Sequence, residues 1–335
     1  WLSTLIVCVA LSVAIAQPPL PRSVHFTQPP GVRPDRFPVL VWEVSYHSWL
    51  RWFPAKEGFQ HLLWSDENLT ECMRKEFPQY VEAFLKLPGG IERSDVGRYC
   101  VLHGLGGIYA DLDYEARQPF FDELPPSLAS LVECRSKDLG VDIENCLMAS
   151  PPGHRLWRMA VERTFGSVGS HRWDDARSGT GPRMLSSLLA ERGGKEALGV
   201  HVLPCRDFQR GVAADSGNAH CGSAVAENGF GAAMGQKGIH WSTTSHTSFV
   251  GAALRSQAFF AVHPELAGRP LLRESIVNRI AVRSVGSAKP AYRLPSEAAQ
   301  LLSACFSGAG FTGDVAGEAR EALAARMATA ASNGV

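Results

Sequence analysis

The chain has 335 residues, of which 45% are hydrophobic and 20% charged, so it can bury a sizeable core. Its 33 basic and 33 acidic residues give a formal net charge of zero, and no block of like charges or basic–aromatic interleaving occurs. This composition excludes nucleic acid as the expected partner.

The N-terminal segment has the character of a targeting sequence. Residues 2–16 form a weakly polar to apolar run that ends in Ala14-Ile15-Ala16. Such a run is typical of a secretory signal peptide or of a truncated signal anchor, although it is shorter than the ~20 residues that span a bilayer. Residues 17–36 contain six prolines and predict an extended stem. Both interpretations place the rest of the chain in the secretory pathway.

The most informative stretch begins at residue 94. Residues 94–105 predict a helix with one buried face, because apolar residues recur at intervals of three and four, and the initial serine is a suitable N-cap. Glycines then favour the end of the helix, and residues 108–110 favour a short strand. Asp111 and Asp113 follow at the carboxyl end of that strand, on the same face as Tyr109.

Two carboxylates at the carboxyl end of a strand suit a hard divalent cation, because ligands of α/β sheets bind at this edge. We expect Mn²⁺ or Mg²⁺ there, with open positions for the phosphate oxygens of a nucleotide. An isolated Asp-x-Asp is more often a solvated turn or a capping pair, so the residues around the pair decide between the two interpretations.

Those residues resemble a known family. The run matches the pattern S-D-x-x-R-Y-x-x-L-x-x-x-G-G-I-Y-x-D-x-D at eleven positions: Ser94, Asp95, Arg98, Tyr99, Leu102, Gly106, Gly107, Ile108, Tyr109, Asp111 and Asp113. This pattern is similar to the sugar-binding region, containing the DXD motif, of glycosyltransferase family 32. The resemblance implies an α/β, GT-A-like nucleotide-diphospho-sugar transferase fold, with a mostly parallel central sheet flanked by helices.

Other segments resemble the family in the same order. Residues 37–46 look like its opening strand, although they lack the usual Ile-His-Gln-x-Trp, and residues 59–69 look like the second strand and an acidic helix start. Residues 143–157 resemble its strand and following helix, 178–185 its Thr-Gly-Pro turn, and 238–241 its late His-Trp segment. We expect a catalytic domain at 37–294, containing a mobile loop at 211–238, and a helical tail at 295–335.

The resemblance assigns roles residue by residue. Asp111 and Asp113 are the expected catalytic residues and, with His240, the expected metal ligands. The expected donor-sugar and nucleotide contacts are Asp95, Arg98, Gly107, Tyr109, Trp42, Asn145, Thr180, Gly181 and Trp241. The alternatives are a surface ion pair for Asp95 with Arg98, a core histidine for His240, and ordinary packing for the others.

Cysteines fit an oxidising compartment. Cys8 lies in the leader, and seven cysteines remain, so at least one is a thiol or pairs with another chain. We expect local disulfides Cys134–Cys146 and Cys205–Cys221, and a buried thiol at Cys100. A zinc site is the rival interpretation, but no C-x-x-C occurs.

The resemblance implies a retaining, metal-dependent glycosyltransferase that takes a hexose from a nucleotide sugar, with GDP-mannose favoured. It would act on a glycan or glycolipid acceptor by same-face displacement. Asp174 and Asp175 are the candidate nucleophiles if the reaction instead uses an enzymic nucleophile. UDP-galactose or UDP-N-acetylglucosamine donors with α-1,4 transfer are the alternative. A secreted carbohydrate-binding pseudoenzyme and a sugar-nucleotide phosphodiesterase are the rival classes.

The resemblance implies a location in the Golgi lumen, as a type II membrane protein held by the N-terminal segment if that segment is not cleaved. Secretion is the alternative. The sequon Asn68-Leu69-Thr70 supports a lumenal location.

Overall fold

The structure is a computed structural model of the whole chain, and it describes residues 19–28, 32–37, 40–136, 140–166, 176–208, 237–240 and 263–266. The leader (2–16), the loop up to residue 236, Trp241, Asp174, Asp175 and the tail (295–335) lie outside these residues. None of the helices in the described ranges combines the length and the apolar character that a bilayer-spanning segment needs.

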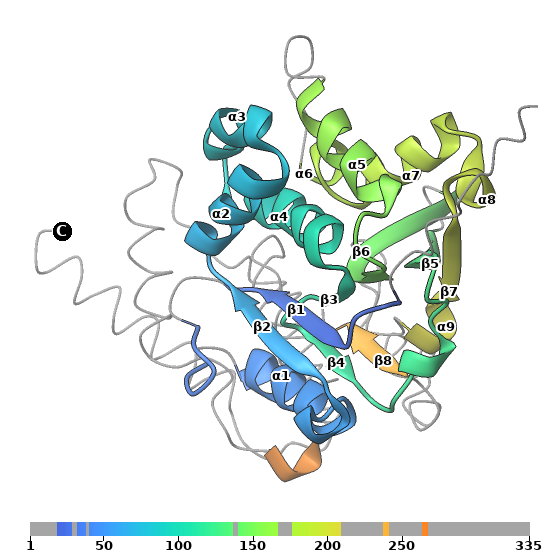
Figure 1. Cartoon of the computed structure of the whole chain (residues 1–335). Coiled ribbons are helices and arrows are strands. Elements are labelled where there is room, and N and C mark those ends of the chain that lie inside the picture. The colour runs from blue at the N-terminus through green and yellow to red at the C-terminus, as the bar shows by residue number, and fades with distance from the viewer. Residues whose placement is uncertain are drawn as a thin grey trace, which may run out of the picture.

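A six-stranded sheet in the order β2-β1-β3-β6-β5-β7 forms the centre of the molecule (Figure 1). Its strands are β1 (Ser23–Thr27), β2 (Gln60–Trp64), β3 (Gly107–Ala110), β5 (Ala129–Ser136), β6 (Gly140–Ser150) and β7 (Val200–Pro204). β1 pairs in parallel with β2 and β3, and β5 pairs in parallel with β7, whereas β6 is antiparallel to both β3 and β5. Together with the helices on its faces, this mostly parallel sheet confirms the expected α/β architecture.

Nine helices occur in the described ranges: α1 (Leu40–Trp52), α2 (Asp66–Glu76), α3 (Val81–Leu85), α4 (Gly90–Leu105), α5 (Arg155–Gly166), α6 (Ala176–Gly179), α7 (Pro182–Glu191), α8 (Gly194–Leu198) and α9 (Cys205–Phe208). Buried apolar residues of α2, α4, α5 and α7 form one core with one face of the sheet. A second core joins the other face to α1 and to the short strand β4 (Tyr114–Ala116). The sheet is therefore covered on both sides, as burial of parallel strands requires.

The first strand lies earlier than expected. Residues 37–46 were expected to form the opening strand, but this prediction is wrong, because α1 begins at Leu40. The opening strand is β1, which lies inside the range expected to be a stem and pairs with both β2 and β3. Val24 and Phe26 of β1 are fully buried, so this short segment belongs to the core.

Segment 59–69 folds as expected, with β2 followed by α2. Ser65 caps α2, because its hydroxyl accepts a hydrogen bond from the backbone N–H of Asn68. The strand and following helix expected at residues 143–157 are likewise present, as the end of β6 and the start of α5.

The motif helix α4 starts before Ser94, so the prediction of a serine N-cap is wrong; the helix begins at Gly90 after Gly89. It ends at Leu105, where Gly106 and Gly107 have φ angles of +65° and +91°. These left-handed conformations suit glycine and turn the chain directly into β3. The helix-to-strand transition expected from the sequence is confirmed.

Two disulfides occur in the described ranges, and neither matches the expected pairing. Cys72 of α2 is bonded to Cys100 of α4, and Cys134 of β5 is bonded to Cys205 of α9. Cys146, expected to pair with Cys134, is instead a buried thiol. The bonded sulfurs belong to elements that pack side by side in the fold, which sequence spacing does not reveal.

Candidate active site

The two motif aspartates lie just beyond the end of β3. Asp111 follows Ala110 directly, and its backbone N–H donates a hydrogen bond to the carbonyl of Cys146 on β6, 2.8 Å away. Asp113 lies in a turn rather than on the strand, and Tyr114 closes this turn with a 2.9 Å bond to the Asp111 carbonyl. The turn, and not the strand alternation expected from the sequence, brings the two carboxylates toward one point.

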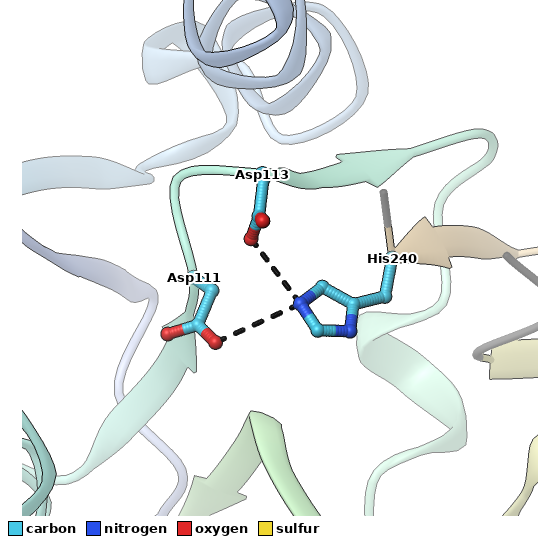
Figure 2. Close-up of side chains that lie close together, drawn as sticks. All are labelled: Asp111, Asp113 and His240. Atoms are coloured by element: carbon cyan, nitrogen blue, oxygen red, sulfur yellow. Dashed lines mark ion pairs between the residues drawn. The ribbon is translucent and has the colours of Figure 1, made fainter. Parts of the chain in front are cut away.

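His240 reaches the same point from far along the chain. It ends β8 (Gly238–His240), which pairs antiparallel with β4 and places His240 opposite Tyr114. Its Nε2 atom lies 3.2 Å from Oδ1 of Asp113 and 3.8 Å from Oδ2 of Asp111 (Figure 2). The structure thus brings together all three residues expected to bind the metal.

This donor set fits a divalent cation. One possible ligand atom from each side chain lies within 4.8 Å of the others. Adjacent ligands of a cation held at about 2.1 Å stand about 3 Å apart. The 3.2 Å between Nε2 of His240 and Oδ1 of Asp113 is close to this separation. Carboxylate oxygens suit Mg²⁺ and Mn²⁺, and a neutral imidazole is compatible with Mn²⁺.

Burial and neighbouring charged groups act against one another in this cluster. Burial raises the pKa of Asp111, an effect that the Arg98 guanidinium opposes and the Asp113 carboxylate reinforces. Burial also opposes the charged form of His240, but Cys146 and Asp113 outweigh it and raise the pKa of His240 well above its usual value. Without a cation, the site therefore tends to hold a proton between the imidazole and the carboxylates.

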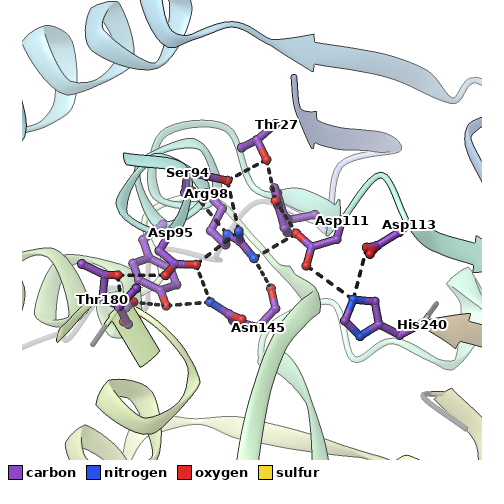
Figure 3. Close-up of polar contacts among 12 residues, drawn as sticks. Thr27, Ser94, Asp95, Arg98, Asp111, Asp113, Asn145, Thr180 and His240 are labelled. Carbon is purple, nitrogen blue, oxygen red and sulfur yellow. Dashed lines mark hydrogen bonds and ion pairs between the residues drawn. The ribbon is translucent and has the colours of Figure 1, made fainter. Parts of the chain in front are cut away.

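Arg98 of α4 connects this cluster to a second carboxylate. Its guanidinium lies 3.0 Å from Oδ1 of Asp111 and 3.2 Å from Oδ1 of Asp95 (Figure 3). Both Asp95 and Arg98 are buried, with 5% and 6% exposure. The alternative of a surface ion pair is therefore wrong.

Asp95 is held by residues expected to contact the donor. Nδ2 of Asn145 on β6 donates to Oδ1 of Asp95 at 2.9 Å, and the hydroxyl of Thr180, after α6, donates to Oδ2 at 2.8 Å. The backbone carbonyl oxygen of Asn145 accepts a hydrogen bond from Nη1 of Arg98, 2.8 Å away. Burial still raises the pKa of Asp95, with Arg98 opposing this effect. The expected donor-site residues thus form one continuous polar network.

The other residues expected at the site lie in different parts of the structure, and only some of them belong to the polar network. Tyr109 belongs to the network, because its hydroxyl donates to Oδ1 of Asp111 at 2.8 Å. Gly181 is the N-cap residue of α7 next to Thr180. Gly107 packs against β1, since a Cβ atom there would lie 2.2 Å from Oγ of Ser23. Trp42 lies on α1 and packs, partly buried, against the second core.

Sequence reasoning missed the contribution of β1. The Thr27 hydroxyl lies 2.9 Å from that of Tyr109 and 2.7 Å from that of Ser94. The signal was present as alternation of polar and apolar residues over Ser23–Thr27, with strand-favouring Val24 and Phe26. Prolines on both sides of the segment favoured the stem interpretation instead.

Comparisons with known proteins relate the motif segment to glycosyltransferases. Residues 42–131 match the family model for the glycosyltransferase sugar-binding region containing DXD motif. Inositol phosphoceramide mannosyltransferase 1 of Schizosaccharomyces pombe is 26% identical over 154 residues, which cover 46% of this chain and 45% of that protein. Mannosyl phosphorylinositol ceramide synthase SUR1 of Saccharomyces cerevisiae is 32% identical over 104 residues, covering 31% of this chain and 26% of that protein.

The chain therefore spans less than half the length of either curated relative. Among solved structures, mouse xyloside xylosyltransferase 1 is similar at a TM-score of 0.38 and 15% identity, covering 66% of this chain and 97% of that chain. Likeness at this level carries no argument about the site. The family match agrees with the resemblance expected from the motif: residues 42–131 are similar to the glycosyltransferase sugar-binding region containing DXD motif.

Proposed function

We propose that this chain is a metal-dependent glycosyltransferase that transfers a hexose from a nucleotide sugar to a glycan or glycolipid. The convergence of Asp111, Asp113 and His240 beside the buried pair Asp95 and Arg98 carries the proposal. Three metal-binding groups and a carboxylate–guanidinium pair, gathered at one edge of an α/β sheet, match the chemistry of a sugar diphosphate.

Each part of the site has a role in this proposal. Asp111, Asp113 and His240 would hold Mn²⁺ or Mg²⁺, which when bound neutralises negative charge on a diphosphate leaving group. Asp95 would accept hydrogen bonds from sugar hydroxyls, because its carboxylate is fixed by Thr180 and Asn145. Arg98 is charged throughout the usual pH range and would orient the sugar or the phosphate.

GDP-mannose is the proposed donor, with retention of the anomeric configuration by same-face displacement. The names of the curated relatives support mannose, because both describe mannosyl transfer onto inositol phosphoceramide. The same names support a glycolipid acceptor. UDP-galactose and UDP-N-acetylglucosamine are the competing donors.

The proposed location is the secretory pathway, with the Golgi lumen and type II topology as its finer form. The two disulfides support an oxidising compartment. The sequon offers Asn68 on the exposed side of the first turn of α2, where a glycan can be accommodated.

The test of the activity measures nucleoside diphosphate release by the full chain from GDP- and UDP-sugars, with and without Mn²⁺. We expect release from one donor, dependent on the metal, and a loss on the order of 100-fold or more in Asp113→Asn, because a ligand to the leaving-group charge is removed. Asp122→Asn is the matched control, since Asp122 is exposed and lies in the turn Phe121–Glu123.

Different products would identify the rival classes. Free sugar phosphate in place of transferred sugar would indicate a phosphodiesterase. Sugar-nucleotide binding with no turnover of any donor would indicate a carbohydrate-binding pseudoenzyme and would contradict the proposal.

A further inference from the structure

The two oxygens of the Asp111 carboxylate have different surroundings. Oδ1 accepts the Tyr109 hydroxyl at 2.8 Å and lies 3.0 Å from the Arg98 guanidinium. Oδ2 faces Nε2 of His240 at 3.8 Å. One oxygen is therefore occupied by the protein, and the other is directed at the candidate metal centre (Figure 3).

A chain of three hydroxyl groups leads to the occupied oxygen. Nη2 of Arg98 donates to the Ser94 hydroxyl at 3.1 Å, and the Ser94 hydroxyl donates to that of Thr27 at 2.7 Å. The Thr27 and Tyr109 hydroxyls lie 2.9 Å apart, and Tyr109 donates to Asp111. Because Arg98 also contacts Asp111 directly, the five side chains form a closed ring.

The direction of every bond in this ring follows from chemistry. A guanidinium only donates, and an ionised carboxylate only accepts. The Tyr109 hydroxyl has one hydrogen and uses it to donate a hydrogen bond to Asp111. Tyr109 must therefore accept the hydrogen bond from Thr27. Thr27 in turn accepts from Ser94. Each hydroxyl thus donates once and accepts once, and every dipole in the chain points toward Oδ1 of Asp111.

Burial strengthens this arrangement. Tyr109 and Arg98 have 1% and 6% exposure, and the Arg98 guanidinium lies 4.6 Å from the centre of the Tyr109 ring. Hydrogen bonds in such surroundings polarise one another and resist rearrangement. Rotating the Asp111 carboxylate would break two bonds to Oδ1 at once, so its orientation is fixed before any ligand arrives.

We propose that Thr27, Ser94 and Tyr109 are positioning residues that hold Oδ1 of Asp111 and thereby present Oδ2 to the metal. Thr27 gives strand β1 a direct part in the site. The inference rests on the proposed function, because it requires Asp111 to bind the cation. Groups that orient a metal ligand typically change metal affinity by about 10- to 100-fold when they are removed.

The test measures Mn²⁺ binding to the full chain by isothermal titration calorimetry, with no sugar nucleotide present. Tyr109→Phe keeps the ring beside Arg98 and removes only the hydroxyl, so we expect the Mn²⁺ dissociation constant to rise about 10-fold or more. Thr27→Val should raise it by a smaller factor, and Thr27→Ser, which retains the hydroxyl, should restore wild-type affinity.

A double variant separates positioning from general destabilisation. Thr27 acts through Tyr109, so Thr27→Val should have no further effect on Mn²⁺ affinity in the Tyr109→Phe background. Tyr80→Phe is the matched control, because Tyr80 packs against Phe165 at the first core, away from the five hydrogen-bonded side chains. We expect its Mn²⁺ affinity to equal that of the wild type.

The outcomes are distinguishable. Wild-type Mn²⁺ affinity in Tyr109→Phe, with only a lower midpoint of urea unfolding, would overturn the positioning role and leave the proposed function intact. Failure of the wild-type chain to bind Mn²⁺ would overturn both, because Asp111 would then not be a metal ligand.

Discussion

His25 is a buried histidine whose partners fix its protonation state. Nδ1 accepts a hydrogen bond from the Trp64 indole N–H at 3.1 Å, so the ring proton lies on Nε2, which is 2.9 Å from the Gly106 carbonyl. A second proton would have to displace the indole. Burial lowers the pKa of His25 to about 4, although the bond to Gly106 opposes this shift.

This lowered pKa predicts acid sensitivity. The histidine of the unfolded chain titrates near pH 6.5 and the folded one near 4, so the unfolded state binds more protons between these values. The free energy of unfolding should be unaffected by His25 above about pH 6.5. It should fall by roughly 3 kcal/mol as the pH drops to about 4. Urea unfolding across this pH range measures the effect.

The control is a comparison of two substitutions. In His25→Gln the fall in unfolding free energy between pH 6.5 and 4 should be shallower than in the wild type, because one contributor is gone. His47→Gln changes an exposed histidine on α1 and should leave the wild-type slope intact. Equal slopes in all three proteins would contradict the assignment to His25.

At the scale of elements, the junction between α4 and β3 depends on close contact with β1. Gly107 has a φ of +91°, and a Cβ atom there would lie 2.2 Å from Oγ and 2.7 Å from the carbonyl oxygen of Ser23. The side chain of Ser23 can rotate, but its backbone carbonyl belongs to the paired strand. This contact brings the motif segment and β1 close enough for Thr27 to reach Tyr109.

Gly107→Ala should therefore be strongly destabilising. A left-handed alanine costs about 1–2 kcal/mol, and displacement of the β1 backbone adds a further 1–3 kcal/mol. Gly153→Ala is the matched control, because Gly153 also has a positive φ, +74°, but open space around its Cα. Urea unfolding should show a clearly smaller loss of unfolding free energy for Gly153→Ala than for Gly107→Ala. Equal losses would mean that the β1 backbone can move aside without a cost in free energy.

The motif itself could be predicted because its residues are contiguous. Asp95 and Arg98 lie on α4, Tyr109 lies on the strand that follows it directly, and Asp111 comes just after that strand, so one short segment carries all four. Thr27 could not be placed this way, because five residues between prolines give a weak strand signal that only pairing with β2 and β3 secures. The position of Asp113 also depended on a turn, which alternation along a strand does not describe.

At the scale of the whole molecule, the disulfides join elements that the sequence keeps apart. Cys134–Cys205 connects β5 to α9 across 71 residues, and Cys72–Cys100 connects α2 to α4 across 28. Pairing of this kind is decided by tertiary packing, which explains why the local pairs expected from spacing were wrong. The longer loop restricts the unfolded chain more.

Peptide mapping without reduction should recover these two linkages. Cys134→Ser should lower the free energy of unfolding by about 4 kcal/mol, since a loop of this length loses that much constraint in the unfolded state. A Cys134–Cys146 peptide from the folded protein would contradict the structure. Cys146 should react with iodoacetamide only after unfolding, because its thiol is buried.

The pairing of β4 with β8 has a consequence for biosynthesis. Both aspartates precede β4, whereas His240 is the last residue of β8 and is synthesised much later. A growing polypeptide thus exposes the two carboxylates on a nearly complete sheet before the imidazole exists. Docking of β8 on β4 is then the late step that assembles the three-residue cluster, so a ribosome-bound chain that stops before residue 240 has the fold's main strands and an incomplete candidate metal site.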